Sequence, residues 1–225
     1  ALTKADPAPE ARDILLETVL SDDPENLNRL VLSHEHMFCV PKIAIGAGRF
    51  YPRAEERLAN ACRLFHEDEV ALFLGIRNPA TWLPAVFAQT PHRDFARIRT
   101  ACPDLPITVW CNEDSPLIWG EIVRAMAGLP TGTKITGAFD LLAKIMSKEG
   151  MLRFRAYLKA HPGLPEPQKR RVMIAFLDKY AVDDAVEEEL DIPGWTDDYV
   201  DGLSELYERD LEAIAELPNV TMISA

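Results

Sequence analysis

The sequence of 225 residues contains no apolar run of the roughly 18 residues that a membrane-spanning helix needs. The first residues, Ala1 to Asp6, do not have the shape of a signal peptide. Basic residues are outnumbered, with 24 Lys and Arg against 36 Asp and Glu, which gives a formal net charge of −12. A chain with that balance lacks the basic face that nucleic acids and anionic membranes require. We therefore expect neither nucleic acid nor membrane among its partners.

Cysteine is also scarce. Cys39, Cys62, Cys102 and Cys111 form no CxxC pair, and their spacing matches no zinc module. Two disulfides are an alternative, but a chain of this length buries a full core without such staples. We expect free thiols in a reducing compartment, and hence a cytoplasmic protein.

Three common catalytic or nucleotide-binding motifs are missing from the given chain. It has no GxSxG nucleophile elbow, no GxxxxGK[ST] loop and no GxGxxG fingerprint. The nearest glycine pair, Gly46-Ala47-Gly48, lacks the third glycine. The sequence therefore offers little support for Ser/His/Asp catalysis or for a dinucleotide fold.

What is present is an alternation of short apolar runs with longer helical patterns. The run at 69–76 is almost continuously apolar, which is typical of a strand buried on both faces of a parallel sheet. Such alternation predicts a three-layer α/β/α fold with a mainly parallel sheet, in a single domain over 1–225 with a helical insertion at about 137–217. The expected strands are 29–33, 69–76, 107–111 and 220–224; the expected helices are 13–20, 51–65, 80–89, 115–127, 137–160, 167–180 and 196–217.

Charge is unevenly distributed along the chain. Residues 183–217 contain fourteen acidic residues and one arginine, so the rest of the chain is nearly neutral. Residues 153–171 carry six basic residues and one glutamate. The acidity is therefore a solvated segment, and a local anion site elsewhere remains compatible with the composition.

Ligands of open α/β sheets bind beyond the carboxyl ends of the strands, so the residues that follow each expected strand are the site candidates. Ser33, His34, Glu35 and His36 follow the first strand. Two imidazoles two residues apart share a face of an extended chain and suggest a metal site, but no further suitable ligands follow. The alternatives are a polar network that satisfies the loop backbone, and a catalytic base or substrate contact. We expect no metal.

Arg77 and Asn78 follow the second strand, immediately before a predicted helix. An arginine at that place can fork onto a phosphate or sulfate, assisted by the helix N-terminus. It can equally cap carbonyls or pair with an acidic loop. After the third strand, Asn112 and Glu113 are candidate ligand contacts, although capping of the next helix by Asp114 or Ser115 is the favoured interpretation.

Three stretches carry a resemblance to known proteins. Residues 30–35 combine a hydrophobic strand with Ser-x-Glu, residues 70–89 place Arg-Asn-Pro before a helix that bears Trp and ends in Gln, and residues 194–220 form a terminal helix and strand. Together they resemble bacterial members of the P-loop sulfotransferase-like superfamily, over most of residues 27 to 225. The resemblance implies a P-loop NTPase-like fold and transfer of a sulfuryl group from 3′-phosphoadenosine 5′-phosphosulfate to a hydroxyl acceptor.

The resemblance also implies roles for particular residues. Arg77, Asn78 and Ser33 would contact the nucleotide, and the base would be one of the three residues 34–36. Two departures matter. The phosphate-binding loop of the family would lie before Ala1 or has been lost, and the serine that holds the 3′-phosphate is replaced by Ala85. One lost charge-assisted hydrogen bond costs roughly 1.5–3 kcal/mol.

Two functions therefore stay open from sequence. One is a divergent sulfotransferase-like enzyme with an unidentified acceptor; the other is a non-catalytic binding or interaction protein of the same fold that has lost nucleotide binding. A homo-oligomer is compatible with either.

Overall fold

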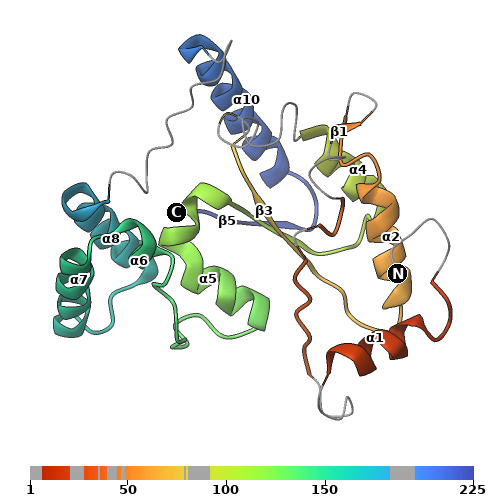
Figure 1. Cartoon of the computed structure of the whole chain (residues 1–225), viewed down its shortest axis with the longest axis horizontal. Helices are drawn as coiled ribbons and strands as arrows, with labels where there is room; N and C mark the ends of the chain where they lie inside the picture. Colours follow the sequence, from red (N-terminus) through yellow and green to blue (C-terminus); the bar gives the residue numbers. More distant parts are fainter. Residues whose placement is uncertain are drawn as a thin grey trace. The chain divides into compact units, whose positions relative to one another are not determined.

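This computed structural model of the chain describes residues 7–20, 28–34, 36–39, 45–46, 49–78, 80, 92–182 and 196–225. It is a mixed structure of helices and strands (Figure 1). The elements in chain order are α1 (Ala11–Val19), β1 (Ile45–Gly46), β2 (Arg49–Phe50), α2 (Ala54–Leu64), β3 (Leu72–Ile76), α4 (His92–Ala101), β4 (Ile107–Cys111), η3 (Asn112–Asp114), α5 (Ser115–Ala127), α6 (Leu142–Ile145), α7 (Lys148–Ala160), α8 (Glu166–Tyr180), α10 (Asp197–Ala215) and β5 (Val220–Ile223).

The main sheet has three parallel strands in the order β3-β4-β5. Its strands begin in register, because Leu72 N–H donates to Pro106 C=O at 3.0 Å and Ile107 N–H donates to Asn219 C=O at 3.0 Å. Parallel strands separated by helices make this an α/β fold, as the sequence predicts. Short β1 and β2 pair separately and antiparallel.

The central strand of this sheet is buried more deeply than β3. In the central strand β4, Ile107 and Val109 are almost completely buried. In β3, only Leu72 is buried and the next two residues are half-buried. The expectation that this strand is buried on both faces is therefore wrong, because β3 is an outer strand among the residues that the structure describes.

The predicted first strand is also wrong. Residues 28–34 have no regular structure, and Val31 and Leu32 are about half exposed. A short apolar run forms a strand only when a neighbouring strand takes its backbone hydrogen bonds. The described part of the chain provides no strand partner for this run.

The chain separates into two compact units, and the strands of the main sheet contribute to both. The first unit comprises 1–74, 79–108 and 196–221, and the second comprises 75–78, 109–195 and 222–225. The single-domain expectation stays a prediction.

The first unit is built on α4, which packs against both α2 and α10. Leu58, Ile98, Tyr207 and Ile214 supply buried apolar side chains from these three helices. The predicted start of α10 is confirmed: Thr196 is its N-cap, the threonine side chain accepts a hydrogen bond from Tyr199 N–H at 3.3 Å, and the first turn holds two aspartates.

A buried arginine in α4 makes hydrogen bonds both to the loop that follows α4 and to the residue before β5. Arg99 is 7% exposed, and one of its Nη atoms donates to the carbonyls of Cys102, Pro103 and Leu105 at 3.2, 2.9 and 2.8 Å. The other donates to Asn219 C=O at 3.3 Å. Carbonyl acceptors thus compensate the desolvation of both Nη atoms, whereas Nε is buried without a hydrogen-bond partner among the described residues.

The second unit has its core between α6, α7 and α8 (Figure 1). The cluster consists of five buried side chains: Leu142, Met146, Met151, Phe154 and Met173. Phe154 is fully buried and meets Phe139 and Phe176 edge-on, with ring centroids 5.2 and 5.7 Å apart. This geometry is the one that aromatic rings prefer.

The expected single helix at 137–160 is instead two helices, α6 and α7. Met146 leaves α6 in an extended conformation and bridges to Ala181, and Ser147 then starts α7 as its N-cap. The Ser147 hydroxyl accepts a hydrogen bond from Gly150 N–H at 3.2 Å. The helix breaks here because the Ser147 side chain caps the start of α7, and this local hydrogen bond competes with continuing α6 through residue 147. The helix predicted at 167–180 is present as α8.

None of the described helices is long and apolar enough to cross a bilayer.

Helix α1 contacts the loop after α2 through one ion pair. None of the nine described residues of α1 is buried, but the Arg12 guanidinium donates to both carboxylate oxygens of Asp68, at 2.8 and 2.9 Å. Those hydrogen bonds hold the pKa of Asp68 below its usual value. The pair is largely solvated, with 41% of the Asp68 side chain exposed, so its contribution to stability is small.

We expect Asp68→Asn to lower the free energy of unfolding by less than about 1 kcal/mol at pH 7. A carboxylate with a depressed folded-state pKa stabilises the protein above its unfolded-state pKa of about 3.9. That stability is lost as the pH falls through the folded-state pKa. Urea titrations from pH 7 to about pH 2.5 should therefore show the difference between wild type and variant shrinking in acid. A difference that stays constant with pH would contradict this assignment. Asp13→Asn is the control, because Asp13 is more exposed and its contact with Arg12 is longer, at 3.4 Å.

Candidate functional site

The candidate site lies at the carboxyl ends of β3, β4 and β5. Arg77 and Asn78 follow β3, the turn Asn112–Asp114 follows β4, and Ser224 and Ala225 follow β5. All of these residues belong to the second unit. Because the three strands are parallel, their carboxyl ends share one edge of the sheet. The sequence predicted the residues at this edge from the positions where the apolar runs end.

The side-chain carboxylate of Glu113 accepts a hydrogen bond from the backbone at the end of β3. Glu113 Oε1 accepts a hydrogen bond from Asn78 N–H at 2.8 Å. An ionised acceptor makes this a charge-assisted bond, which is about twice as strong as a neutral one. Asn78 is one of the residues that the resemblance assigns to the nucleotide, and Glu113 occupies its backbone amide in this structure.

The neighbouring carboxylate contacts the end of β5. Asp114 Oδ2 accepts from Ala225 N–H at 3.4 Å, a long hydrogen bond. Asp114 is also the N-cap of α5, but within the described part of the chain its side chain makes no bond to the first helical amides. The expectation that Asp114 or Ser115 caps α5 is therefore wrong. The helix tolerates the lack of a side-chain cap because Pro116 in its first turn has no N–H, so one fewer amide needs an acceptor.

The electrostatics of this edge are mixed. Arg77 and Asn78 are both half-buried. The residues that follow the strands here include one arginine, Arg77, and two carboxylates, Glu113 and Asp114. Positive and negative side chains are therefore both present at this edge, and they act in opposite directions on an anion.

The histidines predicted as bases lie in the first unit, on a local turn. His34 Nδ1 accepts a hydrogen bond from His36 N–H at 3.1 Å, and Met37 N–H donates to His34 C=O at 3.1 Å. Arg57 on α2 donates to Met37 C=O, also at 3.1 Å. Among the alternatives for these residues, the contacts of His34 fit a polar network that satisfies the loop backbone, because its ring accepts a hydrogen bond from the backbone of its own turn.

This turn limits what His34 can do as a base. A backbone N–H must donate, so Nδ1 of a neutral His34 carries the lone pair and Nε2 carries the proton. His34 can then donate a hydrogen bond from Nε2, but it has no lone pair there to accept a proton. Of the predicted bases, His36 is half-buried, and Glu35 lies outside the described residues.

The predicted site residues are thus divided between the two units. Ser33, His34 and His36 belong to the first unit, while Arg77 and Asn78 belong to the second. Ser33 is exposed in a segment without regular structure. Ala85, the departure at the family's phosphate-binding serine, lies outside the described residues. Among the residues that are described, no three His, Cys, Asp or Glu side chains are grouped as metal ligands.

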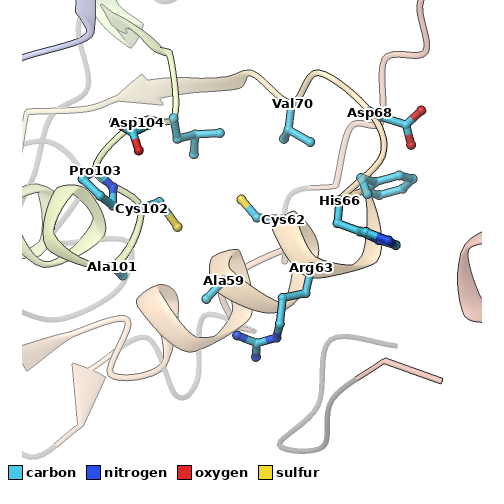
Figure 2. Close-up of a pocket in the computed structure, with 12 residues that line it drawn as sticks. Ala59, Cys62, Arg63, His66, Asp68, Val70, Ala101, Cys102, Pro103 and Asp104 are labelled. Atoms are coloured by element: carbon cyan, nitrogen blue, oxygen red, sulfur yellow. The ribbon is translucent and has the colours of Figure 1, made fainter. Parts of the chain in front are cut away.

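A hollow of about 420 Å³ in the first unit was not predicted from the sequence, and neither was α4, after which part of its lining lies (Figure 2). The hollow is formed where the last turn of α2 faces the chain that follows α4. Two cysteines, Cys62 and Cys102, line it together, and Cys102 is one of the neighbours that raise the pKa of Cys62. No spacing rule pairs these two positions. The local signal is the spacing of Leu58, Ala61, Cys62 and Phe65, which places Cys62 on the apolar face of the helix predicted at 51–65. The lining residues are Ala59, Cys62, Arg63, Phe65, His66, Asp68, Val70, Ala101, Cys102, Pro103, Asp104 and Leu105.

Comparison of the chain with protein-family models, with characterised proteins and with solved structures finds no match in any of the three.

Proposed function

We propose that the protein is a divergent sulfotransferase-like protein with a three-layer, P-loop NTPase-like fold. In this proposal it binds 3′-phosphoadenosine 5′-phosphosulfate through Arg77 and Asn78 at the end of β3. The observation that carries the proposal is the position of this pair, directly after a parallel strand and beside the end of β4. Ligands of open α/β sheets bind at such an edge.

Each residue has a defined task in this proposal. Arg77 supplies a planar fork of donors that matches phosphate geometry, and Asn78 N–H supplies a backbone donor beside it. Glu113 holds this amide in the absence of an anion and releases it when one binds. The nucleotide supplies the sulfuryl group, which passes from its bridging phosphate oxygen to the acceptor hydroxyl oxygen as the hydroxyl proton leaves. Of the bases that the resemblance implies, His34 is disfavoured by the geometry of its turn.

A second function is favoured by the contact between Glu113 and Asn78. A carboxylate that permanently occupies the phosphate position makes the chain a non-catalytic binding or interaction protein. The replacement of the family's serine by Ala85 supports this alternative, because it removes a further phosphate contact. The two functions differ in whether an anion can displace the Glu113 carboxylate from Asn78 N–H.

Calorimetric titration with adenosine 3′,5′-bisphosphate distinguishes the two functions. We expect wild type to bind and Arg77→Ala to bind about ten- to hundredfold more weakly, since a hydrogen bond to a charged group contributes about 1.5–3 kcal/mol. We expect Glu113→Gln to bind about tenfold more tightly than wild type. The glutamine keeps an oxygen for Asn78 N–H, but it no longer repels the phosphate.

Asp114→Asn is the matched control, because it removes the adjacent charge without touching Asn78. Its effect on affinity should be smaller than that of Glu113→Gln. If neither wild type nor Glu113→Gln binds at millimolar nucleotide, with folding verified by circular dichroism, the enzyme function is wrong. The non-catalytic function then takes its place.

A further inference from the structure

The hollow in the first unit contains two thiols on different structural elements. Cys62 lies in the last turn of α2, and Cys102 directly follows the last residue of α4. The two helices pack against each other. Figure 2 shows the two sulfur atoms directed toward one another within the hollow. The fold thus brings together two cysteines that lie far apart in the sequence.

The two thiols differ in exposure. Cys62 is half-buried, whereas Cys102 is 9% exposed. Both line the hollow, and Cys62 is the more accessible of the two. An accessible thiol that attacks first, with a second thiol near it to resolve the mixed disulfide, is the arrangement that intrachain disulfide exchange uses.

We propose that Cys62 and Cys102 are a redox modification site that forms a reversible disulfide within the chain by exchange with a small-molecule disulfide such as oxidised glutathione. The inference is independent of the proposed function, because it uses no residue of the strand-end site.

The exchange is balanced in two steps. The Cys62 thiol loses its proton to solvent, and the thiolate attacks one sulfur of the glutathione disulfide and expels one glutathione thiolate. The Cys102 thiol then loses its proton to solvent, and its thiolate attacks the Cys62 sulfur of the mixed disulfide and expels the second glutathione thiolate. Both expelled thiolates take up a proton from solvent. The two cysteines are oxidised by two electrons, and one glutathione disulfide is reduced to two thiols.

The surroundings of Cys62 make this exchange slow at neutral pH. Burial and the neighbouring Cys102 raise the pKa of Cys62 to about 11, while the positive charge of Arg63 opposes the shift. The other titratable groups that line the hollow are His66, Asp68 and Asp104. Because only the thiolate attacks, the rate should rise about tenfold per pH unit between pH 7 and 9.

The disulfide would join α2 to the end of α4 and close a loop that contains β3, Arg77 and Asn78. A cross-link over a loop of this length reduces the freedom of the unfolded chain. The oxidised protein should therefore melt about 5 °C or more above the reduced one.

The test treats the reduced full chain with oxidised glutathione at about pH 8.5, followed by peptide mapping and a thermal melt. We expect a peptide linked through Cys62 and Cys102, with Cys39 and Cys111 still open to alkylation after denaturation, and a higher melting temperature. In Cys102→Ser, exchange should stop with one glutathione on Cys62. The proposal is overturned if wild type also stops at this mixed disulfide, or if Cys62 links to another cysteine. The double variant Cys39→Ser/Cys111→Ser is the control and should still form the link.

Discussion

Replacement of Phe154 by alanine is expected to lower the free energy of unfolding of the second unit by about 3–5 kcal/mol. Phe154 is fully buried in the middle of the five-residue cluster, and its ring makes edge-on contacts with Phe139 and Phe176. Removing the ring forfeits its burial and leaves a cavity that the surrounding helices fill only in part. It also removes both aromatic contacts, each contributing about 0.5–1.5 kcal/mol beyond area burial.

Urea unfolding followed by far-ultraviolet circular dichroism measures this effect. Leu152→Ala is the matched control, because Leu152 lies in the same helix but is 74% exposed. Its substitution should change the unfolding free energy by no more than about 0.5 kcal/mol. Equal losses in the two variants would mean that α7 buries a different face.

Gly150→Ala has the second largest expected effect, and its sign is opposite to the usual one. Alanine in place of a helical glycine normally stabilises a helix by about 0.8–1 kcal/mol. Gly150 lies in the first turn of α7, where a Cβ would come within 2.5 Å of Tyr180 Cβ and 2.8 Å of Met146 Cγ. Tyr180 Cβ is fixed to the backbone of α8, so the helices must separate. We expect a net loss of about 1–3 kcal/mol.

Gly202→Ala is the counterpart to this substitution. Gly202 lies within α10, and a Cβ built there meets no atom within 4 Å among the described residues. This variant should gain about 0.5–1 kcal/mol, because only helix propensity acts. Thermal and urea unfolding of both variants would test the pair. A gain in both would show that α7 and α8 do not approach closely at Gly150.

Local signals in the sequence predicted several elements well. The runs predicted as strands at 69–76, 107–111 and 220–224 contain β3, β4 and β5, and Thr196 with two following aspartates begins α10. In each of these cases, the residues that define the element are neighbours in sequence. The run at 29–33 looked the same by this measure and is not a strand. Its backbone would need hydrogen bonds from a segment that no local pattern identifies.

In the candidate site, too, local features could be predicted from the sequence and contacts between distant residues could not. The sequence correctly located Arg77 and Asn78 at a strand end, because the chemistry of an α/β edge follows from where apolar runs stop. It could not show that Glu113 takes the Asn78 amide, since that contact joins residues 35 positions apart. Asp114 likewise had a local partner available in α5 and instead contacts Ala225.

By itself, the sequence determined the α/β class, the approximate places of most helices and strands, and which side chains follow the strands. These properties depend on periodicity, capping and burial along short segments. Only the tertiary structure decided which amides the carboxylates occupy, how closely α7 approaches α8 at Gly150, and that Cys62 meets Cys102. Each of these depends on distances between residues far apart in the chain, which are set by the packing of whole elements.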